Sequence, residues 1–187
     1  MIRRSALTLL AALALAAPLG ACQQPATVVE PIKPRAAYTL ASGDRLRVIV
    51  FGQDNLSNIY AVDGAGRIAM PLIDSVPVAG LTTAQAESSI ATRLKAGYVR
   101  EPKVTVEVDT YRPFFILGEV TNSGQFPFVN GMTVQTAVAI AGGYTPRGER
   151  DQAEITRQTP QGVVTGTVPM TYPVQPGDTI VVKERWF

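Results

Sequence analysis

A change of hydrophobic period within residues 111–143 restricts the fold more than any other feature of this sequence. Phe114–Leu117 is an apolar run of strand length, and a turn at Asn122–Gly124 separates it from a second aromatic segment, Phe126–Val129. Across residues 133–141 the apolar side chains recur at helical spacing, and two glycines follow. This stretch therefore predicts a β-hairpin that leads into a short α-helix. It contains no pairing of a nucleophile with a base.

Two alternating stretches and one capped helix are predicted before it. In residues 45–50 and 103–109 apolar and polar side chains alternate, which is typical of a half-buried strand. Thr82 and Gln85 have the spacing of a capping box at the start of a helix, and Gly97 would end that helix. Its inner face would consist of Ala86, Ile90 and Leu94.

Two further hairpins are predicted. The first joins Ile59–Val62 to Arg67–Leu72 through a glycine-containing turn. The second joins Ala153–Gln158 to Val163–Val168.

A Gly-Asp pair precedes a predicted strand twice in the chain. Glycine provides access to positive φ, and a turn aspartate can bond to nearby backbone amides, so the pattern predicts turns more strongly than acid–base chemistry. We expect turn or cap roles for these pairs and for four more glycines. The residues concerned are Gly43, Asp44, Gly118, Gly124, Gly142, Gly143, Gly177 and Asp178.

These elements together predict an α+β protein made of two small mixed modules, residues 38–110 and residues 111–187. Arg112-Pro113 is the expected junction, because a proline ends the alternating strand. No transmembrane helix is expected in the mature chain.

Residues 1–21 have the pattern of a bacterial lipoprotein signal peptide. Met1–Arg4 is basic, and Ser5–Pro18 is apolar but shorter than the roughly 20 residues that span a bilayer. Leu19–Cys22 resembles the lipobox, in which the cysteine thiol is acylated and the chain is cut just before it. Cys22 is the only cysteine, so it cannot form an internal disulfide, and lipidation accounts for it. The alternative is an ordinary secretory signal followed by an unrelated cysteine.

Residues 22–37 are predicted to be a proline-rich tether. At ~3 Å per residue, such a segment reaches on the order of 40 Å from the membrane. Gln23 follows the cysteine, and by resemblance to bacterial lipoproteins the absence of aspartate there favours the outer membrane.

Charge and histidine content exclude several classes of function. The chain has 17 Lys and Arg and 15 Asp and Glu, and removal of Arg3 and Arg4 with the signal peptide leaves 15 of each, because residues 1–21 contain no acid. Nucleic-acid binding is not expected, since it requires a basic stripe. No histidine is present, which removes His-dependent nucleophiles and His-ligated metal sites. A lysine or carboxylate base is still available; no metal and no cofactor is expected.

The arrangement of these motifs resembles the outer-membrane polysaccharide export family. The block from Tyr38 to Phe51, the Gly66-Arg-Ile segment and the helix after residue 81 are similar to its polysaccharide export domain, which would occupy residues 38–110. The block from Gly118 to Phe126, the Gly142-Gly143 ending and Pro176-Gly-Asp178 are similar to one soluble-ligand-binding β-grasp (SLBB-type) domain over residues 111–187.

The resemblance implies a lipid-anchored, periplasm-facing component of a capsular or exopolysaccharide export translocon at the outer membrane of a Gram-negative bacterium. Large family members form rings, work with an inner-membrane polysaccharide co-polymerase and cross the outer membrane through a carboxyl-terminal amphipathic helix. This sequence shows one β-grasp module and no helix after the last predicted strand. We therefore expect a short member that forms or supports a homo-oligomeric conduit, with polysaccharide as cargo and a separate outer-membrane pore protein as partner.

A conduit needs no catalytic residue, so the chain is not expected to be an enzyme. Candidates for lumen or subunit contacts are Arg45, Arg47, Arg67 and Arg112, together with Arg147 and Arg150. Solvated surface arginines are the alternative for each. Trp186 and Phe187 could contact a membrane or a partner, or simply end the chain. The alternative function is a monomeric periplasmic lipoprotein that binds glycan or peptidoglycan without transporting it.

Overall fold

The structure is a computed structural model and describes residues 37–159 and 162–186. The predicted signal peptide, the predicted lipidation site Cys22 and the predicted tether up to residue 36 lie outside the described residues, as does Phe187. Within the described ranges the buried apolar side chains form two separate cores. The chain is α+β, as the sequence predicts, with one helix packed into each core.

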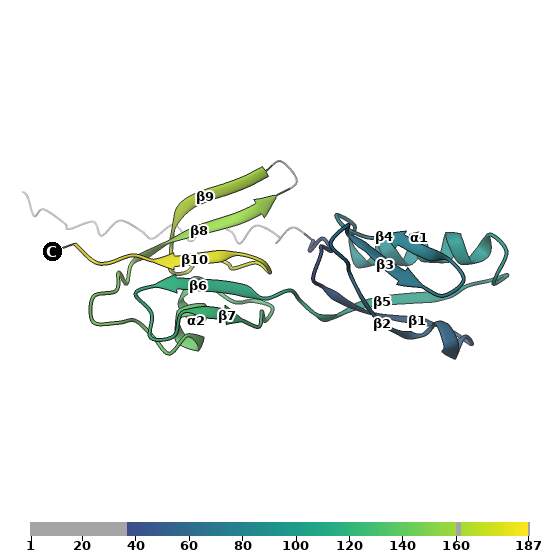
Figure 1. Cartoon of the computed structure of the whole chain (residues 1–187), viewed down its shortest axis with the longest axis horizontal. Helices are drawn as coiled ribbons and strands as arrows, with labels where there is room; N and C mark the ends of the chain where they lie inside the picture. The colour runs from purple at the N-terminus through teal and green to yellow at the C-terminus, as the bar shows by residue number, and fades with distance from the viewer. Residues whose placement is uncertain (1–36, 160–161, 187) are drawn as a thin grey trace, which may run out of the picture. The chain divides into compact units, whose positions relative to one another are not determined.

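The first core is built on a three-stranded antiparallel sheet with β1 (Arg45–Val50) in the centre (Figure 1). It is flanked by β2 (Asn58–Ala61) and β5 (Val104–Thr110), and a 3-10 helix, η1 (Asp54–Leu56), leads into β2. Every second side chain of β1 is buried, starting at Leu46, which confirms the predicted alternation.

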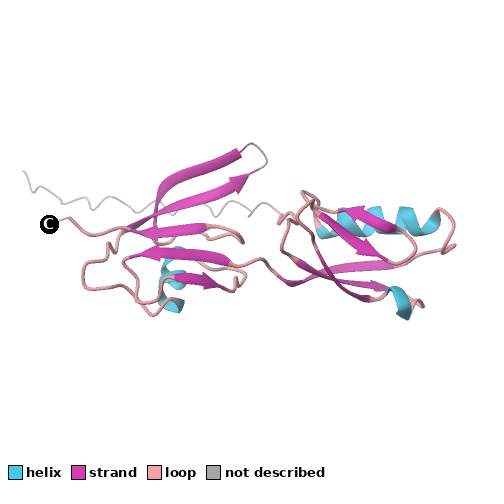
Figure 2. Ribbon diagram, viewed as in Figure 1, coloured by secondary structure: helices cyan, strands magenta, loops and turns pink. Residues whose placement is uncertain are grey.

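The helix α1 (Thr83–Lys95) packs into this core, and Figure 2 shows it in cyan, as it does every helix. The Gln85 N–H donates to the Thr82 hydroxyl and the Thr82 N–H donates to the Gln85 side chain, so the predicted capping box is confirmed. A carboxylate oxygen of Glu87 accepts the Val106 N–H at 2.9 Å, which ties the helix to β5. The predicted inner face is confirmed, because Ala86, Ile90 and Leu94 are fully buried.

The predicted hairpin between Ile59–Val62 and Arg67–Leu72 is wrong. The structure pairs β2 with β1, whereas β3 (Arg67–Met70) pairs with β4 (Asp74–Pro77), a strand that the sequence did not suggest. The two segments flanking the predicted turn therefore belong to different sheets.

Two consecutive turns explain this difference. Asp63 accepts hydrogen bonds from the N–H groups of Ala65 and Arg67, so a turn does form between β2 and β3. The chain then reverses into β4 through Leu72 and Asp74, which have φ of 72° and 53°. Positive φ is uncommon for a side chain such as leucine, and without a glycine this second turn has no clear sequence signal.

The second core is built on a five-stranded sheet and one short helix, α2. The sheet order is β7-β6-β10-β8-β9, in which only the central pair, β6 and β10, is parallel. A mixed sheet whose first and last strands lie parallel in the centre, with a helix on one face, is the β-grasp arrangement. The elements are β6 (Phe114–Gly118), β7 (Gly124–Phe126), α2 (Val134–Ile140), β8 (Gln152–Thr159), β9 (Gly162–Pro169) and β10 (Thr179–Val182).

The hairpin and helix predicted for residues 111–143 are confirmed, with one correction. The second strand is Gly124–Phe126 and not Phe126–Val129, because Phe126 pairs with Phe114 and the ladder runs back toward Gly124. Phe128 instead lies in the core, where its ring meets that of Tyr111 edge-on at 5.4 Å.

No helix within the described ranges is long and apolar enough to span a membrane.

Candidate functional site

Asp44 is fully buried at the turn that precedes β1. Its Oδ2 accepts hydrogen bonds from the Ala41 N–H at 2.9 Å and from the Tyr38 hydroxyl at 2.6 Å. Its Oδ1 accepts the Arg112 N–H at 3.0 Å, and Arg112 Nη1 lies 3.4 Å from Oδ2. The same Nη1 donates to the Tyr38 hydroxyl oxygen at 2.6 Å. This carboxylate therefore ties the turn before β1 to residue 112.

Asp178 is equally buried, at the turn that precedes β10. Its Oδ1 accepts Arg157 Nε at 2.8 Å, and its Oδ2 accepts Arg157 Nη2 at 2.7 Å and the Gln175 N–H at 2.7 Å. Arg157 Nη2 also donates to the Pro173 carbonyl at 3.1 Å. The ion pair is bidentate, which fixes the orientation of the guanidinium.

The two aspartates share one local geometry. Each accepts the N–H of the residue three positions before it, and each pairs with an arginine that lies over a tyrosine ring. The guanidinium carbon of Arg112 is 5.8 Å from the Tyr38 centroid, and that of Arg157 is 5.5 Å from the Tyr172 centroid. The repeated Gly-Asp pattern in the sequence thus corresponds to a repeated carboxylate–arginine–tyrosine cluster.

The Arg112 side chain lies against both turns. A Cβ at Gly177 would come within 2.6 Å of Arg112 Nε, and a Cβ at Gly43 would contact Arg112 Cβ at 3.4 Å. Glycine at position 177 therefore gives the guanidinium the space that it occupies.

Burial and hydrogen bonding shift two pKa values in these clusters. Burial, reinforced by the bond to Asp44, raises the pKa of the Tyr38 hydroxyl far above its usual range. The hydrogen bonds with Asp178 raise the pKa of Arg157, so this arginine stays charged within its ion pair.

All six glycines expected in turns or caps have positive φ. Gly118 is the most restricted, with φ of 86° and with the Val182 carbonyl oxygen only 2.1 Å from where its Cβ would lie. That close approach is made by the parallel pairing of β6 with β10.

The candidate arginines are dispersed among separate interactions. Arg47 pairs with Asp109 at 2.5 Å on the exposed face of β1, and this ion pair lowers the pKa of Asp109. Arg45 is exposed on the same face, and Arg67 is exposed on β3. Arg112 forms an ion pair with Asp44, and Arg147 forms ion pairs with Glu119 and Glu184. Arg150 lies over the ring of Tyr144. Trp186 is 94% exposed.

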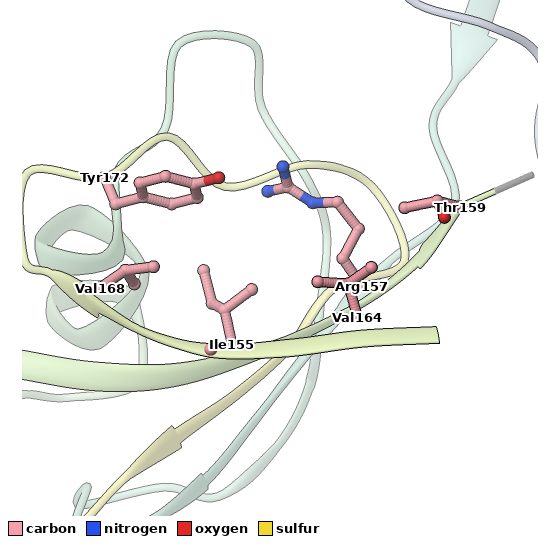
Figure 3. A pocket seen from close by; sticks show the side chains of 7 residues that line it. Ile155, Arg157, Thr159, Val164, Val168 and Tyr172 are labelled. Carbon is pink, nitrogen blue, oxygen red and sulfur yellow. The ribbon is translucent and has the colours of Figure 1, made fainter. Parts of the chain in front are cut away.

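One hollow beside these clusters lies on the face of β8 and β9 that carries Ile155 and Arg157, and we call it the β8–β9 pocket. Figure 3 shows Tyr172 and the Arg157 guanidinium on one side of it and Ile155 on the other. Its volume is about 260 Å³, and it is lined by Ile155, Arg157, Thr159, Val164, Gly166, Val168 and Tyr172. Thr159 also borders a second hollow of about 390 Å³, together with Arg112 and Gly177.

Arg157, Tyr172 and Gly166 were not identified from the sequence. Arg157 did carry a signal, because it shares the inward face of β8 with Ala153 and Ile155. An arginine at such a position requires a buried acid, and Asp178 is that acid. Which carboxylate it would meet depends on the pairing of β8 with β10, which sequence reasoning did not provide.

No group of three or more His, Cys, Asp or Glu side chains that could hold a metal ion occurs in residues 37–159 and 162–186.

Two family profiles match this chain side by side. The profile described as polysaccharide biosynthesis/export protein matches residues 33–109, and the SLBB domain profile matches residues 113–168. The chain belongs to the polysaccharide export family. The first family match ends in β5 and contains the first core. The second begins just before β6 and ends in β9, so it covers the second core except for the segment that includes β10.

Curated relatives agree with this family. The chain is 31% identical over 167 residues to the EPS I polysaccharide export outer membrane protein EpsA of Ralstonia solanacearum, covering 83% of this chain and 44% of the relative. It is 30% identical over 118 residues to the exopolysaccharide production protein ExoF of Rhizobium meliloti (strain 1021), covering 57% of this chain and 28% of the relative. A third relative is the polysialic acid transport protein KpsD of Escherichia coli, 26% identical over 111 residues, 58% of this chain and 20% of that protein. The chain thus spans less than half the length of these relatives.

Proposed function

We propose that this protein is a component of a polysaccharide export system in the envelope of a Gram-negative bacterium. The observation that carries the proposal is the succession of an export-family match and an SLBB match on two separately cored α+β units. Relatives named for exopolysaccharide production, polysaccharide export and polysialic acid transport support the same role.

The proposed location is the periplasmic side of the outer membrane, reached through a lipid on Cys22. The lipobox pattern at residues 19–22 supports the anchor, and Gln23 supports the outer membrane. More than one acyl chain would hold the protein stably, whereas a single chain gives only reversible binding. The proline-rich tether would place the residue 38–110 and 111–187 domains in the periplasm.

The proposed assembly is a homo-oligomer that forms or supports a conduit. The edge strand β9 supports this part of the proposal, because it contains no charged residue and its Val163 and Val164 are 67% and 57% exposed. Edge strands of monomeric proteins are commonly protected against pairing with another chain by charged side chains or prolines, among other devices. In β9 the only such residue is a proline at its last position, Pro169. Phe115 and Leu117, 41% and 45% exposed on β6, add apolar surface on the same sheet.

The proposed partners are an inner-membrane polysaccharide co-polymerase and a separate outer-membrane pore protein, with polysaccharide as cargo. No catalytic role is proposed. Asp44 and Asp178, the buried carboxylates of the two turns, are both engaged by an arginine and by backbone N–H groups.

Deletion of the gene tests the export role directly. We expect the polymer to be synthesised and retained inside the cell, with secretion restored by a plasmid copy. Normal secretion in a deletion strain without a paralogue would contradict the proposal.

The alternative is a monomeric lipoprotein that binds glycan or peptidoglycan. Native mass spectrometry of the acylated protein in mild detergent separates the two. A ring or other closed oligomer supports the conduit, and monomer alone at high protein concentration supports the alternative.

A further inference from the structure

We propose that the β8–β9 pocket binds one uncharged pyranose ring of a polysaccharide chain. The inference rests on the proposed export function and adds to it a binding site, a ligand class and the residues that make the contacts.

The pocket is lined in part by a strand glycine, Gly166. It lies in the middle of β9, its φ is outside the left-handed region, and no atom lies within 4 Å of where its Cβ would be. Neither backbone conformation nor crowding therefore requires glycine at this position. A glycine inside a strand with open space above it is typical of a place where a ligand approaches the backbone.

The walls of the pocket fit a sugar ring. Ile155, Val164 and Val168 provide an apolar surface, and the half-buried Tyr172 provides an aromatic ring with a hydroxyl at its edge. A pyranose has apolar faces made of C–H groups and a periphery of hydroxyls. Its faces match the valine, isoleucine and tyrosine surfaces, and its hydroxyls match the polar edge.

The charges of the pocket favour a neutral ligand. Asp178 neutralises Arg157 through Nε and Nη2, and the Tyr172 side chain is also hydrogen-bonded to this guanidinium. The arginine is therefore held at a fixed place within a neutral ion pair, which suits an uncharged sugar better than a carboxylate. The Thr159 hydroxyl donates to the Gly162 carbonyl at 2.8 Å, which leaves its oxygen as an acceptor.

The size of the pocket limits occupancy to about one ring. Its volume of about 260 Å³ is below the roughly 300–1,000 Å³ of typical ligand pockets. Binding is therefore weak, as passage of a polymer requires. A longer chain can continue past Thr159 toward the second hollow at Arg112 and Gly177.

The test is a titration of the full mature chain, ¹⁵N-labelled and held in detergent micelles. The probes are neutral trisaccharides of glucose, galactose and mannose and a trisaccharide of galacturonic acid. We expect at least one neutral trisaccharide to bind in the millimolar range and to shift the amide signals of Thr159, Gly166 and Val168. We expect raised salt to leave this binding unchanged and the acidic trisaccharide to bind no more tightly.

Two variants of β9 provide the matched comparison. Gly166→Val fills the pocket and should weaken neutral-sugar binding at least tenfold, while the thermal unfolding midpoint stays the same or rises. Thr167→Val changes the neighbouring position, which faces the other side of the sheet, and should bind as the unsubstituted chain does.

Three outcomes overturn the inference. They are the absence of any shift at these amides with all neutral sugars, unchanged binding by folded Gly166→Val, and salt-sensitive binding of the acidic trisaccharide alone. Failure of the export role is seen separately, as normal secretion after gene deletion. Blocked secretion in the deletion strain without neutral-sugar binding in the titration would reject the pocket and retain the export role.

Discussion

Arg157 and Asp178 form a bidentate ion pair that joins β8 to the turn before β10, with nitrogen-to-oxygen distances of 2.8 and 2.7 Å. The side chain of Asp178 is 1% exposed and that of Arg157 is 17% exposed. The pair thus lies in the interior between two hydrogen-bonded strands, where its geometry and its partners decide its contribution to stability.

Removal of one partner should therefore be costly. We expect Asp178→Ala to lower the free energy of unfolding by about 3–5 kcal/mol, because it leaves a buried guanidinium unpaired. Urea denaturation measures this. In the Asp178→Ala background, the further substitution Arg157→Ala should lower the free energy of unfolding far less than Arg157→Ala does in the unsubstituted protein.

The surface pair Lys183–Glu154 is the matched control for this prediction. Its side chains are 59% and 31% exposed, so Glu154→Ala should cost no more than about 1 kcal/mol. Equal losses for Glu154→Ala and Asp178→Ala would mean that burial does not decide the effect.

Two glycines of the second core should respond in opposite ways to alanine. Gly118→Ala should lower the free energy of unfolding by at least about 1–2 kcal/mol, since φ is positive there and the new Cβ meets the Val182 carbonyl oxygen. Gly166→Ala should raise it by about 0.5–1 kcal/mol, because glycine weakens a strand interior. Urea denaturation of both variants checks the contrast. A lower free energy of unfolding for Gly166→Ala would show that the space next to Gly166 is not open to a Cβ.

Tyr38 should make the folded state sensitive to alkaline pH. Its pKa is raised by burial and by the bond to Asp44, so the folded protein keeps the proton after the unfolded chain loses it at about pH 10. The contribution of the protonated Tyr38 to the free energy of unfolding is complete below that pH and is lost as the pH rises above it. Above that pH the free energy of unfolding falls by at most about 1.4 kcal/mol per pH unit because of Tyr38, and solvent that reaches the half-buried ring reduces this effect.

Substitution of this tyrosine isolates the effect. Tyr38→Phe should reduce the fall of stability between about pH 9 and pH 11, measured by urea denaturation. It should not abolish the fall, because burial also raises the pKa values of Tyr60 and Tyr144. An unchanged slope would contradict the assignment of the shift to Tyr38.

Lipidation at Cys22 is testable without structural information. We expect Cys22→Ser to abolish labelling by a palmitate analogue and to leave the protein unprocessed or unanchored. Fractionation of membranes and immunoblotting measure both effects. Labelling that persists in the variant would show that the acyl chain is carried elsewhere.

The elements that the sequence predicted well depend on local interactions. The alternation in β1, the capping box of α1 and the helix stop at Gly142 involve residues within a few positions of one another. The errors concern which strands pair and in which register, including the bounds of β7. The partner of β2 is β1, and the non-glycine turn at Leu72 creates β4, neither of which has a local pattern that distinguishes it.

The candidate site divides in the same way. The sequence alone determined the two Gly-Asp turns, the α+β class and the family resemblance, because turn chemistry and hydrophobic period are properties of neighbouring residues. Only the tertiary structure decided that Asp44 meets Arg112 and that Asp178 meets Arg157, and only the pairing of β8 with β9 placed Gly166 beside Ile155 in one pocket. A buried carboxylate must be neutralised by whichever cation the fold brings to it, and that choice is made between residues far apart in the chain.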